Sequence, residues 1–221
     1  VVGEAPAHVR DTELVLVESG VDELLAAEKI EFADLNYSEV RAVPNAGGAC
    51  KLQEFFFPRQ VLEADLVVSL PKLKTHHWAG VTLAMETLFG VMPGLVYGWP
   101  KNVLHHAGIS QAILDLTATL RPQLSIVDGI VGMEGDGPIM GTPRAAGLIV
   151  AGTNPVAVDA TAARLMGFDP GRLDYLAVAS GRLGPIRESH IEQRGEALPG
   201  LVQHFSLLDH PAMRRLRGAQ I

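Results

Sequence analysis

The segment that most constrains the fold runs from Leu66 to His77 and reads LVVSLPKLKTHH. Its first half is a short apolar run closed by Pro71, a pattern typical of a buried strand. Its second half carries four cationic or titratable side chains: Lys72, Lys74, His76 and His77. In open parallel sheets, ligands bind beyond the carboxyl ends of the strands. The segment therefore predicts a strand of a buried sheet with a polar site at its end.

Two further apolar runs, at 124–127 and 148–151, predict buried strands, and helical spacing between 109 and 120 predicts a helix between them. Asn154 and Pro155 form a favourable start for another helix. Strands that alternate with helices indicate an α/β fold. We expect a parallel or mixed sheet covered by helices on both faces.

The length of 221 residues suits a single α/β domain over 1–221, with a core at about 1–185 and a polar tail at about 186–221. The chain begins at Val1, without a methionine and within a segment that reads as part of the folded domain, so we expect the N-terminal part to be truncated.

The formal net charge of −7 argues against nucleic acid as a partner. No apolar run is long enough to span a bilayer and no secretory signal is visible, so we expect a cytoplasmic protein that does not bind membranes. Cys50 is the only cysteine, so this chain alone cannot form an all-cysteine iron–sulfur site. The oligomeric state stays open.

The cationic cluster after Leu70 has two interpretations. If the chain stays extended, Lys72, Lys74 and His76 share one face and His77 lies on the other. Together they can bind a carboxylate or phosphate, and a desolvated lysine can act as a base or a Schiff-base amine. The alternative is a solvated loop whose charges only keep the sheet edge wet.

The segment DGIVGMEGDGPIMGTPR, residues 128–144, predicts a glycine-rich loop. Its carboxylates suit a hard divalent cation such as Mg²⁺, or they can pair with the lysines upstream. Its glycines allow the backbone to approach a ligand closely, and Arg144 can bind an anion. A purely structural turn is the alternative. The predicted metal ligands are Asp128, Glu134 and Asp136, and the predicted ligand-binding glycines are Gly129, Gly135 and Gly137.

Two smaller features complete the candidates. His105 and His106 precede the predicted helix and can either join a metal site or form a local hydrogen-bond network. Asp159 is acidic within an otherwise apolar helical stretch, so we expect it to face the core, paired with Arg164 or a backbone amide.

Four stretches, LPKLKTHHWAGVTL, YGWPKNVLHHAGI, IVDGIVGMEGDGPIMGTPR and NPVAVDATAARLMGFDP, resemble the uncharacterised family catalogued as domain of unknown function 362. The resemblance covers most of the chain. It implies an α/β protein of bacteria or archaea, and some members carry a fused ferredoxin-type module. It therefore also implies redox chemistry and a ferredoxin-type protein as a partner, because this chain has no such module.

One departure from the family pattern bears on activity. Where the family usually has Lys-Asn, this chain has Glu86 and Thr87. The change reverses a charge, so it predicts altered specificity or lost activity if that lysine acts on an anionic substrate.

The sequence-based hypothesis is an enzyme of oxidoreductase or isomerase type that acts on a small anionic molecule by redox or proton-transfer chemistry, with a divalent metal left open as cofactor. One alternative is a module that binds a metal, a metallocofactor or an iron–sulfur partner, and another is a degenerate scaffold. The predicted catalytic residues are Lys72, Lys74, His76 and His105, and the other predicted ligand-binding residues are His77 and Arg144.

Overall fold

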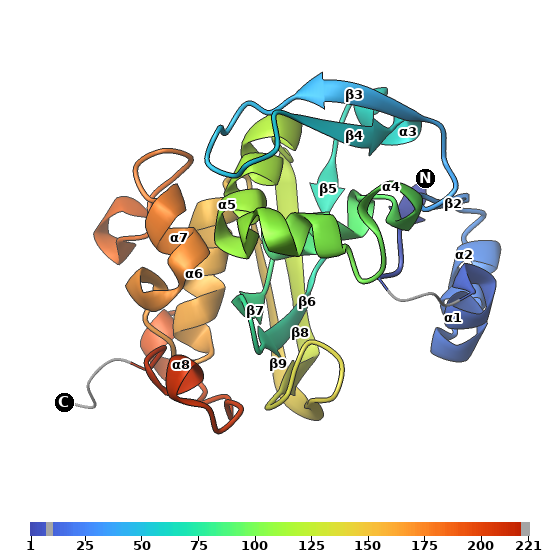
Figure 1. The fold of residues 1–221 in the computed structure, drawn as a ribbon. Helices are drawn as coiled ribbons and strands as arrows, with labels where there is room; N and C mark the ends of the chain where they lie inside the picture. Colours follow the sequence, from blue (N-terminus) through green and yellow to red (C-terminus); the bar gives the residue numbers. More distant parts are fainter. Residues whose placement is uncertain (8–10, 218–221) are drawn as a thin grey trace.

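The computed structural model describes residues 1–7 and 11–217. Its centre is a five-stranded mixed sheet packed against helices (Figure 1), which confirms the predicted α/β class. Strand β8 pairs in parallel with β5 and β6 on one side and antiparallel with β9 on the other, while β7 runs antiparallel to β6. The strands are β5 (Val68–Ser69), β6 (Lys72–His76), β7 (Gly80–Thr82), β8 (Leu124–Glu134) and β9 (Thr142–Gly152).

The predicted strand near Leu66 is present as two pieces, β5 and β6, separated by Leu70 and Pro71. Proline has no N–H to donate to a neighbouring strand, so it interrupts the ladder. Its carbonyl still accepts a hydrogen bond from the Asp128 N–H at 2.8 Å, which keeps both pieces beside β8.

The glycine-rich segment is not the loop that the sequence predicted. Strand β8 continues through it to Glu134, and β9 begins at Thr142, so only the residues between them form the turn of a long hairpin. Gly129 and Gly132 lie inside β8, where a Cβ atom would come within 2.7 Å of Leu148 and 2.6 Å of the Leu73 carbonyl oxygen, respectively. These glycines let neighbouring strands and side chains pack closely.

Helices α5 (Asn102–Leu120) and α6 (Pro155–Leu165) lie beside the sheet in Figure 1, and the short helix α7 (Asp174–Ala179) contacts both of them. Asn154 caps α6 as predicted, because its side chain accepts a hydrogen bond from the Ala157 N–H. Helix α6 contacts β8 and β9. The opposite face of these strands carries exposed Ile149 and half-exposed Asp128, so helical cover is incomplete there.

Helix α5 begins earlier than predicted and kinks at Gly108, whose φ of 106° lies outside the helical region. Strand β7 ends at Thr82, and the 3₁₀ helix η1 (Glu86–Val91) follows it. Val81 and Thr82 pair with β6, which draws the start of that segment into the sheet.

The N-terminal part forms a separate parallel strand pair, β1 (Val2–Glu4) and β2 (Phe32–Asp34), beside helices α1 (Thr12–Ser19) and α2 (Val21–Ala27). Next come the hairpin strands β3 (Val40–Pro44) and β4 (Glu54–Pro58), then α3 (Arg59–Leu62). Phe55 and Phe57 of β4 are fully buried. The remaining short helices are α4 (Gly94–Tyr97), η2 (Pro170–Arg172), η3 (Glu188–His190), η4 (Leu198–Gly200) and α8 (Pro211–Arg214).

The segment after Pro185 has little regular structure, yet part of it enters the core. Phe205, Met213 and Leu216 are each at most 3% exposed and join the main hydrophobic cluster. This tail therefore packs on the rest of the molecule.

Candidate functional site

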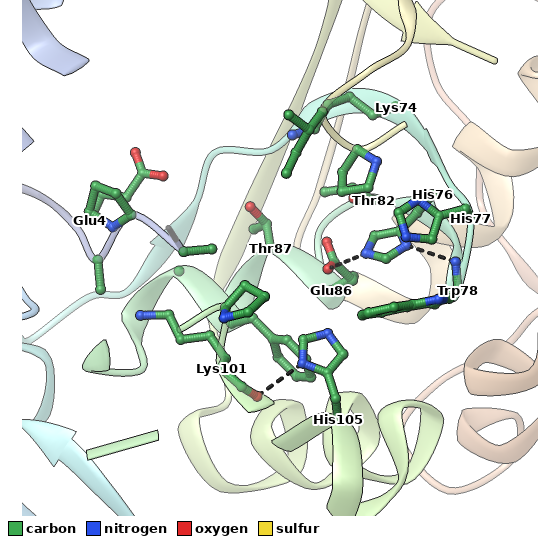
Figure 2. A pocket seen from close by; sticks show the side chains of 18 of the residues that line it. Glu4, Lys74, His76, His77, Trp78, Thr82, Glu86, Thr87, Lys101 and His105 are labelled. Carbon is green, nitrogen blue, oxygen red and sulfur yellow. Dashed lines mark hydrogen bonds and ion pairs between the residues drawn. The ribbon is translucent and has the colours of Figure 1, made fainter. Parts of the chain in front are cut away.

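A cavity of about 470 Å³ lies where β6 ends, and it is bounded by several separate parts of the chain. These parts are the N-terminal segment around Glu4, helix α1, the end of β6 with the turn after it, the segment from β7 into η1, the start of α5 and the β8–β9 turn. Figure 2 shows the ionisable side chains that converge there. They are Glu4, Lys74, His76, His77, Glu86, Lys101 and His105.

His76 is buried in the wall of this pocket, and both its ring nitrogens are occupied. Nδ1 faces the backbone N–H groups of Trp78 and Ala79 at 3.1 and 3.2 Å, so it must be the acceptor. The ring proton therefore lies on Nε2, which faces Glu86 Oε1 at 3.4 Å. The turn after β6 thus fixes the tautomer of His76 and directs its N–H toward Glu86.

Glu86 is buried, and His76 stabilises its ionised form. Burial acts to raise the pKa of Glu86, but its interaction with His76, foremost their hydrogen bond, and the charge of Lys74 outweigh it, so the pKa lies below its ordinary value. Glu86, the residue at which this chain departs from the family pattern, therefore lies in the pocket wall in contact with His76. That this departure alters specificity or activity stays a prediction.

His105 has the opposite tautomer. Its Nδ1 lies 2.9 Å from the carbonyl oxygen of Lys101, which can only accept, so Nδ1 carries the proton. Burial lowers the pKa of His105 and outweighs the opposing effect of that hydrogen bond. The ring is therefore neutral near pH 7 and keeps an unprotonated Nε2, for which the described residues provide no hydrogen-bond donor.

Lys101 is a pocket residue that the sequence did not indicate. It is 1% exposed, and its Nζ lies 3.1 Å from Asn36 Oδ1, which also accepts from the Gly94 N–H. Burial lowers the pKa of Lys101 to about 8. Its left-handed backbone, with φ of 67°, presents its carbonyl to His105, so the residue helps to build the site through both its ends.

Behind the pocket, Asp159 anchors the segment that carries Glu86. It is fully buried and accepts hydrogen bonds from the Ala84 and Met85 N–H groups, at 2.7 and 3.1 Å, and from the Tyr175 hydroxyl at 3.0 Å. The predicted pairing with a backbone amide is thus confirmed. The other predicted partner, Arg164, instead bonds the carbonyls of Ala160 and Ile186.

The structure separates the predicted cationic cluster. Lys74, His76 and His77 line the pocket, whereas Lys72 lies outside it and pairs with Asp128. The register between β6 and β8 shifts between Lys72 and Lys74, which separates the surroundings of the two lysines. The hydrogen bond from Lys72 lowers the pKa of Asp128, as the predicted pairing of opposite charges implied.

His77 also differs from the extended-strand prediction. It lies just beyond β6, so it does not alternate away from His76, and their ring centroids are 5.4 Å apart. Its Nδ1 lies 2.7 Å from the Gly137 carbonyl oxygen and 3.6 Å from Asp136. The turn of the β8–β9 hairpin therefore holds His77 at the pocket.

The three predicted metal ligands do not converge on one point. Asp128 pairs with Lys72, Asp136 lies beside His77, and Glu134 accepts from the Ser206 N–H and lies 3.8 Å from Arg144. Among residues 1–7 and 11–217, no group of three or more His, Cys, Asp or Glu side chains is placed to hold a metal ion. The three carboxylates therefore do not form a single cluster, and their role as metal ligands stays a prediction.

The predicted ligand-binding glycines have structural surroundings as well. A Cβ on Gly137 would lie 2.0 Å from the Thr75 carbonyl oxygen, and Gly135 adopts a φ of 83° in the turn. Neither these two nor Gly129 lines the pocket, and Arg144 lies outside it too. Their role in binding a ligand stays a prediction.

The pocket and the mixed sheet define an α/β protein with a partly buried cavity, lined by both ionisable and apolar side chains, beyond the end of one strand. A family model described as domain of unknown function (DUF362) matches residues 1–164. The chain therefore belongs to this family, which confirms the resemblance in its sequence motifs.

One curated relative is the thylakoid-associated protein sll1697 of Synechocystis sp., which is 30% identical over 160 residues. The match covers 70% of this chain and 49% of the relative, so the chain spans about half the length of that protein. No solved structure matches the chain.

None of the helices in the described part of the chain has the length and apolar character needed to cross a membrane.

Proposed function

We propose that the pocket binds a small molecule with an acidic group and that His105 accepts a proton from this molecule. The orientation of the His105 ring carries the proposal. Nδ1 donates to the Lys101 carbonyl, and burial keeps the ring neutral, so Nε2 is available as a base in the cavity wall. A positioned, neutral imidazole is an effective general base near pH 7.

The charges around His105 support an acidic ligand in one orientation. Lys74 and His105 lie on opposite sides of the pocket in Figure 2. The ionised carboxylate of Glu86 repels an anion placed beside it, whereas Lys74 attracts one. An acidic group at Lys74 would therefore leave the rest of the ligand near His105.

His76 is less suited to act as the base. Accepting a proton at Nδ1 would replace two hydrogen bonds from backbone N–H groups with a repulsive contact. Its contribution is to hold Glu86. Among the sequence-based hypotheses, the geometry favours proton transfer, and the cytoplasmic location and ferredoxin-type partner stay predictions.

The test follows exchange of carbon-bound hydrogen for deuterium in D₂O by proton NMR. The probes are the 2-oxo acids pyruvate and phenylpyruvate, whose C3 hydrogens are acidified by the neighbouring carbonyl. We expect the wild-type chain to accelerate exchange of at least one probe, and His105→Gln to reduce that rate by a factor of about 100 or more. His106→Gln, an exposed neighbour outside the pocket, should leave the rate unchanged.

Lysine variants test the binding half of the proposal. Lys74→Met should weaken binding of the exchanging acid, whereas Lys51→Met, an exposed lysine outside the pocket, should not. Exchange that is absent in the wild type, or undiminished in His105→Gln, would overturn proton transfer. Acid binding without exchange would leave the non-catalytic binding module as the better description.

A further inference from the structure

The same pocket is larger than a two- or three-carbon acid requires. Its volume of about 470 Å³ lies in the range of cavities that hold drug-sized molecules. A ligand that consisted of little more than an acidic group would leave most of this space without protein contacts. The size of the pocket therefore implies a second, larger part of the ligand.

The chemistry of the wall indicates what that second part is. Apart from the ionisable groups, the lining is largely apolar, and it comes from the N-terminal segment, α1, η1, the start of α5 and the β8–β9 turn. The apolar side chains include Ala5, Val15, Phe89, Pro100, Pro138 and Ile139. Such a wall stabilises a ligand by removing its apolar surface from water.

Aromatic side chains flank the proposed base on two sides. The ring centroids of Trp78 and Phe89 lie 5.0 and 5.6 Å from that of His105, and both contacts are edge-to-face. At the pocket, Trp78 is 61% exposed and Ile139 is 49% exposed. These two large side chains thus offer apolar surface to a ligand in the pocket.

We infer that the ligand is an amphipathic acid, whose acidic group meets Lys74 and whose apolar body, of at least the size of a six-membered ring, packs against Phe89, Pro100 and Ile139. The acidic end rests on the proposed function, whereas the apolar end rests on the volume and lining of the pocket. The inference narrows the substrate class from any small anion to acids with a bulky apolar part.

Isothermal titration calorimetry of the full chain with four carboxylates provides the test: acetate, hexanoate, benzoate and 2-naphthoate. Because each buried methylene is worth roughly 0.8 kcal/mol, we expect affinity to rise by about fourfold per methylene from acetate to hexanoate. The acid 2-naphthoate should bind more tightly than benzoate, and its neutral analogue 2-naphthalenemethanol should bind more weakly than the acid.

Two matched variants locate the apolar end. Ile139→Asn should weaken 2-naphthoate binding at least fivefold and leave that of acetate unchanged. Ile130→Asn changes an isoleucine that is similarly exposed but does not line the pocket, so it should bind 2-naphthoate as the wild type does. Because both isoleucines are largely at the surface, both variants are expected to fold.

The outcomes separate this inference from the proposed function. Equal affinity across the four acids would overturn the inference and leave acid binding intact, as would an Ile139→Asn variant that binds 2-naphthoate normally. Equal binding of 2-naphthoate and its neutral analogue would overturn the acidic end in both proposals. Absence of binding by every probe would overturn both completely.

Discussion

Backbone atoms orient the key ionisable side chains of the pocket and its support. His76 accepts from the N–H groups of the turn that follows it, His105 donates to the carbonyl of Lys101, and Asp159 accepts from the N–H groups of Ala84 and Met85. Backbone groups do not titrate, so the partners that set these orientations keep the same charge at every pH. Single residues therefore acquire their chemical properties from the local chain path.

Asp159 makes the stability of the fold depend on pH. Burial raises the pKa of Asp159 to about 7, although three hydrogen-bond donors oppose it, whereas the value for an unperturbed aspartate is 3.8. The folded chain therefore binds more protons than the unfolded chain between these values, and this group's contribution to stability falls as pH rises from about 4 to 7. The full difference corresponds to about 4 kcal/mol.

Urea unfolding of wild type and Asp159→Asn from pH 4 to 8 measures this contribution. Asparagine does not titrate, so the wild type should lose stability relative to the variant as pH rises through this window. A difference in unfolding free energy that stays constant with pH would contradict the assignment.

Lys101 also makes the stability of the fold depend on pH, but at higher pH and in the opposite direction. Burial lowers the pKa of Lys101 from 10.5 to about 8, so the folded chain binds fewer protons than the unfolded chain between these values. Wild-type stability should therefore rise relative to Lys101→Met as pH increases from about 8 to 10.5. At pH 7 the variant should unfold at the higher temperature in a calorimetric scan, and a lower melting temperature there would contradict the account.

The residues show why the candidate site was only partly predictable. Lys74, His76 and His105 were identifiable because they occur in polar clusters next to predicted strands or helices. Lys101 gave no such signal, since its burial depends on Asn36, which lies 65 positions earlier in the chain. The role of Glu86 was hidden for a similar reason, because its partner His76 belongs to another element.

At the scale of elements, the β8–β9 hairpin shows how a pattern can have two meanings. Repeated glycines and carboxylates indicated a ligand-binding loop, but Gly132 lies within β8, where the Leu73 carbonyl oxygen leaves no room for a larger side chain. Such an approach between strands is a tertiary contact that local sequence does not encode. By contrast, the cap at Asn154 and the break at Pro71 were predictable, because both depend on adjacent residues.

Two glycine substitutions in this hairpin separate the contribution of close packing to stability from the contribution of backbone conformation. Gly132→Ala would place a Cβ 2.6 Å from the Leu73 carbonyl oxygen, so we expect destabilisation of at least about 2 kcal/mol. Gly135→Ala meets no atom within 4 Å but forces alanine to a φ of 83°, which costs about 1–2 kcal/mol. Denaturant unfolding of both variants checks the order, and a milder effect at Gly132 would contradict it.

At the scale of the whole molecule, the pocket depends on elements that lie far apart in the chain, from Glu4 to Ile139. The alternation of strands and helices along the sequence was enough to predict an α/β protein. The position of the N-terminal segment against η1 did not follow from any local pattern. The pocket is consequently a property of the assembled fold.

The C-terminal tail after Pro185 is also packed into the core of the fold. Removing residues 204–221 would delete Phe205, Met213 and Leu216 from the core, each of which is almost fully buried. Burial of one such side chain contributes about 1.5–3 kcal/mol, so the shortened chain should lose several kcal/mol of stability. Thermal unfolding followed by circular dichroism measures this loss, and an unchanged melting temperature would contradict the packing of the tail.

The central claim is that the fold holds His76 and His105 in opposite tautomers and so leaves Nε2 of His105 free to act as a base in the pocket. Long-range ¹H–¹⁵N correlation NMR of the histidine rings at pH 7 tests it most directly, with His76→Gln and His105→Gln to assign the signals. We predict a neutral His105 with its proton on Nδ1 and a His76 ring with its proton on Nε2. A protonated His105, or one with its proton on Nε2, would contradict the account.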